Sequence, residues 1–139
     1  SQLGINRVQE FLNKIEYGNQ TTSSNLDLYW SDFSLKISPL EQVTLLKKFN
    51  TNEFHLNSQN VFSVKNAIKI ASIPNGNFYG KTGTGRVNGQ DINGWFIGYV
   101  ETSDNSYYFA TNIQSDSNAT GKKAFEITSD ILKKLHIWN

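Results

Sequence analysis

Hydrophobic residues follow two different spacings along the chain. In four segments they recur every three to four positions, which is the pattern of an amphipathic helix that buries one face. These segments predict helices over about residues 5–16, 39–50, 58–70 and 121–135. Ahead of the last helix, runs of aromatic and β-branched residues alternate with short Gly- and Asn-rich stretches, as strands and turns do. They predict strands over about residues 78–82, 95–101 and 107–114.

The order of these elements predicts the fold class. Short links between consecutive strands favour an antiparallel meander. The last helix carries the stripe Ala124, Ile127, Ile131 and Leu135, which is expected to pack across the sheet. The chain is therefore expected to be a single α+β unit, with helices ahead of an antiparallel sheet and a C-terminal helix packed against it.

Local sequence marks several boundaries of these elements. Ser38 suits a helix N-cap, Pro39 the first helical position and Glu41 the third, which completes a capping box. Tyr17-Gly18-Asn19 is expected to stop the first helix, because glycine suits the left-handed residue that follows a helix end. Loops or turns are expected at residues 20–25, 73–77, 86–93 and 102–106, and residues 26–37 are expected to form a packed loop.

Composition narrows the classes of function. The chain has 139 residues, of which 37% are hydrophobic and 13% aromatic, and this favours a folded domain over disorder. A net charge of +1 offers no field for nucleic acid. There is no cysteine, and His55 and His136 lie outside any cluster with metal-ligand spacing, so no metal site is expected. The chain has no run long enough to span a membrane and no signal-peptide pattern, and Ser1 is not expected to be the natural start.

Candidate chemistry is concentrated in residues 78–85. Lys81-Thr82-Gly83 sets an ammonium, a hydroxyl and an unencumbered backbone side by side on a strand, which suits an acidic ligand. A solvated lysine on a strand is the other interpretation of Lys81. A Walker A phosphate loop is excluded, because it needs a glycine five residues before Gly80, where this chain has Asn75, and a helix directly afterwards.

Several motifs together resemble one family. Lys81-Thr82-Gly83 resembles the Lys-Thr-Gly element of the serine penicillin-recognising enzymes, which include penicillin-binding proteins and serine β-lactamases. Further stretches resemble class D serine β-lactamases and the related penicillin-sensor domains of β-lactam-responsive receptors. They are Tyr17-Gly18-Asn19, Leu28-Tyr29-Trp30, and residues 35–42 and 94–101. With the final helix, the resemblance covers nearly the whole chain.

The resemblance implies a role for each residue of a site. Lys81 would be catalytic, as an ammonium that organises the hydrogen bonds and lowers the cost of proton transfer. Thr82 would bind the ligand carboxylate, and Gly83 would leave room for the ligand against the strand. The backbone N–H of Thr84 would be one half of an oxyanion hole. Trp30 would hydrogen-bond to a carbamylated lysine that acts as general base, although core packing is its other interpretation.

The residue that would bind the carboxylate alongside Thr82 stays open. Many class D enzymes use an arginine near the start of the last helix, where this chain has Ala124 preceded by Lys122 and Lys123. Either lysine, or Arg86 from the loop after the strand, could take this role. A lysine would bind as a point charge, without the bidentate fork of a guanidinium.

The sequence departs from the family in one respect. The family's nucleophile lies in an S-x-x-K motif well ahead of Y-G-N, and no S-x-x-K occurs in this chain. The chain therefore resembles the C-terminal half of a catalytic domain. The nucleophile and the carbamylated lysine are expected on an N-terminal segment of the same domain, with no separate cofactor. Without that segment, this half should leave a sheet edge unpaired and an apolar helix face uncovered, and it is not expected to be stable alone.

The implied function is β-lactam hydrolysis through a serine acyl-enzyme, in an extracytoplasmic protein of a Gram-positive bacterium. The antibiotic and the N-terminal segment would be the partners. A sensor domain that is acylated without turnover is one alternative, and an inactive fragment is another. Enzyme and sensor share every motif in this chain, so the sequence does not separate them.

Overall fold

The computed structural model describes residues 4–22, 34–74 and 76–138 of the chain. The described part contains four helices and one four-stranded antiparallel sheet with the strand order β1-β2-β3-β4. The helices are α1 (Ile5–Lys14), α2 (Pro39–Asn50), α3 (Ser58–Ala67) and α4 (Gly121–Lys134), and the strands are β1 (Lys69–Ile73), β2 (Gly76–Val87), β3 (Gln90–Thr102) and β4 (Ser106–Gln114). The predicted α+β class, the meander and the C-terminal helix are confirmed.

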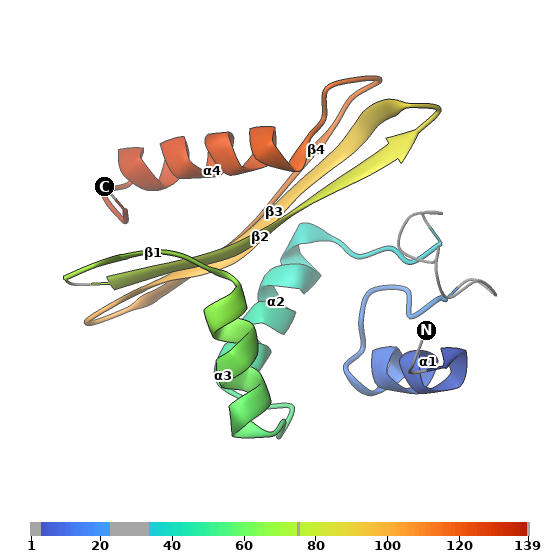
Figure 1. The fold of residues 1–139 in the computed structure, drawn as a ribbon, viewed down its shortest axis with the longest axis horizontal. Coiled ribbons are helices and arrows are strands. Elements are labelled where there is room, and N and C mark those ends of the chain that lie inside the picture. The colour runs from blue at the N-terminus through green and yellow to red at the C-terminus, as the bar shows by residue number, and fades with distance from the viewer. Residues whose placement is uncertain (1–3, 23–33, 75, 139) are drawn as a thin grey trace.

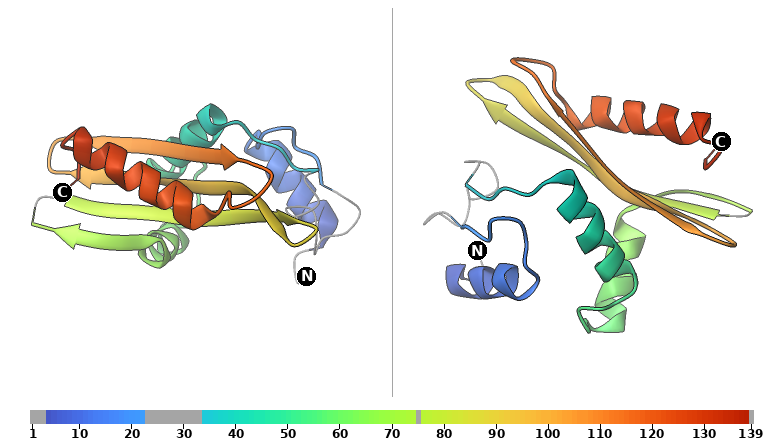
Figure 2. Two further views of the ribbon diagram at one scale, coloured as in Figure 1. Left: turned by 90° about the horizontal axis from the view of Figure 1, so that it is seen from above. Right: turned by 180° about the vertical axis from the view of Figure 1, so that it is seen from behind.

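The helices lie on both sides of the sheet. Figures 1 and 2 show α4 along one face and α2 against the other, with α3 next to α2 on that same side and α1 away from the sheet. The sheet therefore has an α4 face and an α2 face, and alternate residues of each strand point to one or the other.

The hydrophobic core lies between the sheet and α4. Its buried members are Phe78, Phe96, Val100, Ala124, Leu132 and Trp138. The ring of Phe78 lies edge-on to that of Phe96, with 6.0 Å between their centroids. Phe125 of α4 contacts both rings, with centroid distances of 6.3 Å and 5.0 Å. These aromatic contacts hold the first part of β2 and the middle of β3 against α4, so β2 continues from a rigid core towards its open end.

The predicted stripe of α4 is wrong in part. Ala124 is buried, but Ile127, Ile131 and Leu135 are 37%, 47% and 62% exposed. The row that faces the sheet consists of Gly121, Ala124, Thr128 and Leu132. Small residues at three of these four positions let the helix approach the strands closely. The predicted stripe therefore lies on the exposed side of α4.

Two element boundaries differ from those predicted. The third helix was expected to reach residue 70, but it ends at Ala67, and Lys69–Ile73 forms β1, which sequence analysis missed. The predicted loop over residues 86–93 is a continuation of β2 and β3, joined by the two-residue turn Asn88-Gly89 with φ of 49° and 79°. Positive φ at both residues gives a type I′ turn, which Asn-Gly favours because its twist matches that of the strands.

Two other local predictions can be compared with the structure. The capping box of α2 is present, since Glu41 N–H donates to Ser38 Oγ at 3.2 Å and Ser38 N–H donates to Glu41 Oε2 at 2.8 Å. The first helix ends at Lys14, two residues before the predicted end. The first left-handed residue after the helix is Glu16. Gly18 is also left-handed, with φ of 50°, but it lies in the turn that follows.

Candidate functional site

The predicted anion-binding edge lies on β2, just beyond the end of its pairing with β1. The backbone N–H of Gly80 donates at 2.8 Å to the carbonyl of Ile68, the residue directly before β1. Peptide groups two residues apart in a strand point to the same side. The N–H and C=O groups of Thr82 and Thr84 therefore point to this edge, where none of the described strands pairs with them. An oxyanion-hole donor at Thr84 would need such an open position.

Alternation along β2 divides the Lys-Thr-Gly residues between the two faces of the sheet. Thr84 belongs to the α4 face, since its Oγ1 accepts a hydrogen bond from Gly121 N–H at 2.9 Å. Thr82 lies under the same helix start, where a Cβ added at Gly121 would come within 2.9 Å of Thr82 Cβ. Lys81 and Gly83 consequently lie on the α2 face. The two threonines and the lysine thus approach a ligand at the strand edge from opposite sides.

The side chain of Lys81 is exposed and contacts its own strand. Its Nζ donates to the carbonyl oxygen of Thr82 at 2.7 Å, so in this structure the ammonium lies at the open strand edge. Gly83 is exposed as well, and an added Cβ there would meet only Trp95 Cβ, at 3.8 Å. The fold does not itself require glycine at this position, so the space beside Gly83 is available to a ligand.

A cavity of about 1010 Å³ lies on the α2 face beside Gly83. One wall is the end of the β2–β3 hairpin, with Gly83, Thr84, Gly85 and Arg86 on β2 and Asn93, Trp95 and Ile97 on β3. The opposite wall comes from the Y-G-N turn, the segment before α2 and the first turn of α2, with Tyr17, Leu35, Lys36, Ile37 and Gln42. This cleft, called the β2 cleft below, is lined by Tyr17 of the Y-G-N turn and by Gly83 of Lys-Thr-Gly. A second hollow, of about 570 Å³ and lined by Lys47, Asp104 and Tyr108, lies away from these motifs.

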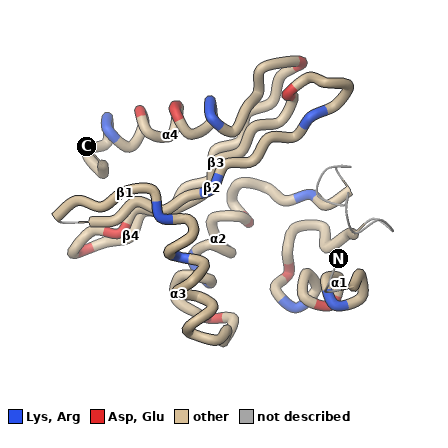
Figure 3. Tube along the Cα trace, viewed as in Figure 1, with Lys and Arg blue, Asp and Glu red and all other residues tan. Residues whose placement is uncertain are grey.

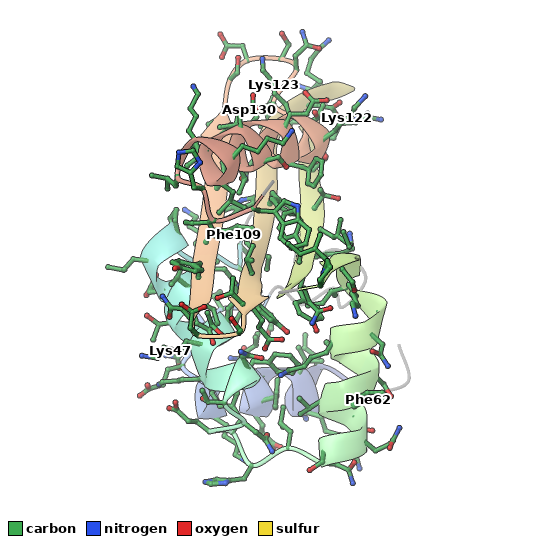
Figure 4. The ribbon with its side chains drawn as sticks, turned by 90° about the vertical axis from the view of Figure 1, so that its left-hand side faces the viewer. Lys47, Phe62, Phe109, Lys122, Lys123 and Asp130 are labelled. Carbon is green, nitrogen blue, oxygen red and sulfur yellow. The ribbon has the colours of Figure 1, made fainter. Side chains whose placement is uncertain are left out.

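The cations predicted to bind a carboxylate differ in their surroundings. Arg86 Nε lies 2.7 Å from Asp91 Oδ1 across the hairpin. This hydrogen bond and the opposite charge hold the pKa of Asp91 below its ordinary value and raise the pKa of Arg86. Lys122 is exposed in the first turn of α4, with Nζ 3.9 Å from Glu126 Oε1, and Figure 4 shows it beside Lys123 on that helix. Charged residues of both signs are scattered over the helices and hairpins (Figure 3).

One predicted site residue cannot be placed. Trp30 lies outside the described residues, so its proposed contact with a carbamylated lysine stays a prediction. Among the residues that the structure does describe, no three His, Asp or Glu side chains are grouped as metal ligands. No helix in these ranges is long and apolar enough to cross a membrane.

Sequence analysis missed a polar network on the same face as Lys81. Asn50 Nδ2 donates to Glu101 Oε1 at 3.2 Å and to Tyr108 Oη at 2.8 Å. Burial raises the pKa of Tyr79, and the negative charge of Glu101 and a hydrogen bond to it add to the effect. Tyr99 is fully buried, which raises its pKa further. The spacing of two between Tyr79 and Lys81, and between Tyr99 and Glu101, could have placed these side chains on one face.

The role of the Y-G-N turn was also missed. The sequence alone favours a helix C-cap at Tyr17-Gly18-Asn19, but in the structure the turn binds the segment before α2. Asn19 Nδ2 donates to the carbonyl of Ser34 at 2.7 Å, and Lys36 N–H donates to Asn19 Oδ1 at 2.9 Å. No local signal could have revealed these contacts, because the partners are 15 and 17 residues apart.

Several known proteins are similar to this chain over nearly its whole length. The methicillin resistance mecR1 protein of Staphylococcus aureus is 45% identical over 130 residues, which are 94% of this chain and 22% of that protein. The regulatory protein BlaR1 of Bacillus licheniformis is 46% identical over 137 residues, or 99% of this chain and 23% of that protein. The probable β-lactamase YbxI of Bacillus subtilis is 38% identical over 132 residues, or 95% of this chain and 47% of that protein.

Solved structures agree with these sequence relationships. The C-terminal domain of the Bacillus licheniformis BlaR penicillin-receptor matches with a TM-score of 0.93 and 45% identity, over 99% of this chain and 56% of that one. A class D β-lactamase from Bacillus subtilis matches with a TM-score of 0.89 and 36% identity, over 99% of this chain and 56% of that one. The chain thus spans a little over half of each solved domain and matches the C-terminal half of their fold.

The family model for the penicillin-binding protein transpeptidase domain matches residues 1–133. This match covers the Y-G-N turn, the β2 cleft, the Lys-Thr-Gly edge and almost all of α4. The chain therefore belongs to the penicillin-binding protein transpeptidase domain family, and within it the chain is close to the BlaR1 and MecR1 receptors and the class D β-lactamases.

Proposed function

We propose that this chain is the ligand-recognising half of a β-lactam-binding domain, in which an N-terminal segment supplies the serine that becomes acylated. The observation that carries the proposal is the open edge of β2, where Lys81, Thr82, Gly83 and Thr84 lie beside the β2 cleft. A strand edge with free peptide groups, an ammonium and a hydroxyl suits a small molecule that has a carboxylate and a reactive carbonyl.

In this proposal the residues of β2 orient and stabilise the reacting ligand. The serine hydroxyl gives its proton to a base on the N-terminal segment as its oxygen attacks the β-lactam carbonyl carbon, the ring C–N bond breaks, and a proton returns to the ring nitrogen. Thr84 N–H stabilises the developing oxyanion, and Thr82 binds the carboxylate together with Lys122 or Arg86. Lys81 stabilises negative charge during proton transfer, and Gly83 lets the ligand lie against the strand. Trp30 would support the base on the N-terminal segment.

The fate of the acyl group separates two functions. The higher identity with the mecR1 protein and BlaR1, 45% and 46%, favours a sensor that stays acylated. Hydrolysis of the acyl group is the second candidate, and it is supported by the similarity to class D β-lactamases in sequence and fold. A sensor and a hydrolase would both meet β-lactams outside the cytoplasm, so we propose an extracytoplasmic location in a bacterium.

The test is intact-mass spectrometry of the complete domain that carries this chain, followed over time with benzylpenicillin. An adduct of one penicillin mass that persists supports the sensor, and an adduct that forms and is then lost supports the hydrolase. The chain alone, which has no S-x-x-K, is the control and should gain no mass. A complete domain that gains no mass with any penicillin would contradict the proposed function.

A further inference from the structure

Asn19 joins two segments that are far apart in the sequence. Three hydrogen bonds connect it to the segment before α2: Asn19 Nδ2 donates to the carbonyl of Ser34 at 2.7 Å, Asn19 N–H donates to the carbonyl of Lys36 at 2.9 Å, and Lys36 N–H donates to Asn19 Oδ1 at 2.9 Å. The backbone N–H and the backbone carbonyl of Lys36 are therefore both hydrogen-bonded to Asn19. We call this set of bonds the Asn19 clip.

Gly18 makes the clip possible. A Cβ added to Gly18 would lie 1.8 Å from the carbonyl oxygen of Lys36, and the residue has a φ of 50°. Only glycine combines this left-handed conformation with so close an approach of another backbone. The contact is therefore built into the turn.

The clipped segment is a wall of the β2 cleft. Leu35, Lys36 and Ile37 line the cleft opposite Gly83 and Thr84. At its other end the segment runs directly into the capping box of α2 at Ser38, so it is fixed at both ends. Tyr17 Oη donates to Gln42 Oε1 at 3.2 Å, which ties the same turn to α2.

We propose that Asn19 is a positioning residue for the β2 cleft: its side-chain amide and backbone N–H hold Leu35–Ile37 at a fixed distance from the Lys-Thr-Gly edge and so determine which acyl side chains fit between them. This role rests on the proposed function, because it concerns how a β-lactam is accommodated. The clip bonds lie at the exposed surface, far from the core between the sheet and α4. Their loss should therefore alter the shape of the cleft before it alters the folding of the domain.

The experiment compares acylation of the complete domain by two ligands that differ in side chain, 6-aminopenicillanic acid and benzylpenicillin. Asn19→Ala should lower the second-order acylation rate constant at least tenfold for benzylpenicillin and change the ratio between the two ligands at least threefold. Asn19→Asp keeps an acceptor for Lys36 N–H but cannot donate to Ser34, so its values should fall between. Asn13→Ala is the matched control, because Asn13 is an exposed asparagine of α1 whose side chain accepts a hydrogen bond from Gln9.

A second readout needs no β-lactam. The amide proton of Lys36 should exchange with solvent at least tenfold faster in Asn19→Ala and at the original rate in Asn13→Ala. Equal losses of acylation with both ligands would show that Asn19 only supports folding and would overturn the positioning role. The role would also be overturned if Asn19→Ala kept the original acylation rates and the original exchange rate of the Lys36 amide. If the unmutated domain is not acylated at all, the proposed function and the positioning role both fail, while the exchange rates still report whether the clip exists.

Discussion

Gly83→Ala should separate ligand binding from stability. An added methyl group would meet only Trp95 Cβ, at 3.8 Å, which is ordinary van der Waals contact. Gly83 is not among the residues with positive φ, so alanine can adopt its conformation. A Gly→Ala change at such a site restricts the unfolded chain and typically stabilises a protein by about 0.4–1 kcal/mol. We therefore expect an equal or slightly higher free energy of unfolding.

The same methyl group should hinder acylation. It would project from β2 into the β2 cleft, where the proposed ligand lies against the strand. Inserting a methyl group into an occupied contact costs about 1–3 kcal/mol. At about 1.4 kcal/mol per decade, this corresponds to acylation that is roughly 5- to 150-fold slower.

Gly80→Ala is the matched control on the same strand. A Cβ at Gly80 would lie 2.5 Å and 2.6 Å from two ring atoms of Phe96, whose side chain is 1% exposed. The core must shift to accept it, which should lower the free energy of unfolding by about 1–3 kcal/mol.

The assay pairs thermal unfolding of the complete domain with acylation rates from intact mass. The reasoning would be refuted if Gly83→Ala were acylated at the original rate. A loss of stability in Gly83→Ala as large as that in Gly80→Ala would refute it too.

Four other changes test the site and its surroundings. Lys81→Ala should slow acylation at least a hundredfold while leaving the unfolding temperature unchanged, because this lysine is exposed; near-original acylation would contradict its assignment. Tyr108→Phe should lower the free energy of unfolding by about 1 kcal/mol, the typical value of one hydrogen bond, because its hydroxyl binds a side-chain amide of α2. Tyr99→Phe should cost less, since the buried Tyr99 hydroxyl has no hydrogen-bond partner among the described residues; the reverse order in chemical denaturation would refute this account. Asp91 should titrate below its ordinary value of 3.8, since Arg86 favours the carboxylate, so its contribution to stability is present above that pH and is lost as the pH falls through the lowered pKa. NMR titration should show the Asp91 midpoint rising in Arg86→Gln, and an unchanged midpoint would exclude the pairing.

Elements with strong local signals could be predicted from the sequence. The predicted bounds of α2 agree with the structure, because Ser38, Pro39 and Glu41 mark its start and an apolar face follows. β1 could not be predicted, because its residues Lys69–Ile73 directly follow α3 and extend the apolar spacing of that helix. Only the pairing of Ala71 with Phe78 and its neighbours, which is a tertiary contact, decides that the chain becomes a strand there.

The same distinction applies to the candidate site. The Lys-Thr-Gly residues are consecutive, so the sequence could place them on one strand, and alternation in a strand then assigns each to a face. The sheet-facing side of α4 was misjudged, because Gly121 and Thr128 pack there by virtue of their size rather than their hydrophobicity. The Asn19 clip was missed because hydrogen bonds between residues 19 and 34–36 depend on the path of the intervening chain.

The arrangement also indicates how the work of recognition and bond making is divided within the family fold. In the proposed function, this half holds the carboxylate-binding and oxyanion-binding groups on β2, which is anchored to the core through Phe78. It has no S-x-x-K, so the proposed function assigns the acylated serine to an N-terminal segment of the same domain. Changes in the Lys-Thr-Gly edge or the Asn19 clip should therefore alter how fast and how selectively a β-lactam reacts. Whether the acyl group is later released should depend mainly on the base and the water, which the proposed mechanism assigns to the other half. A receptor and a hydrolase can thus share the fold and the motifs of this half, which explains why its sequence and structure resemble both.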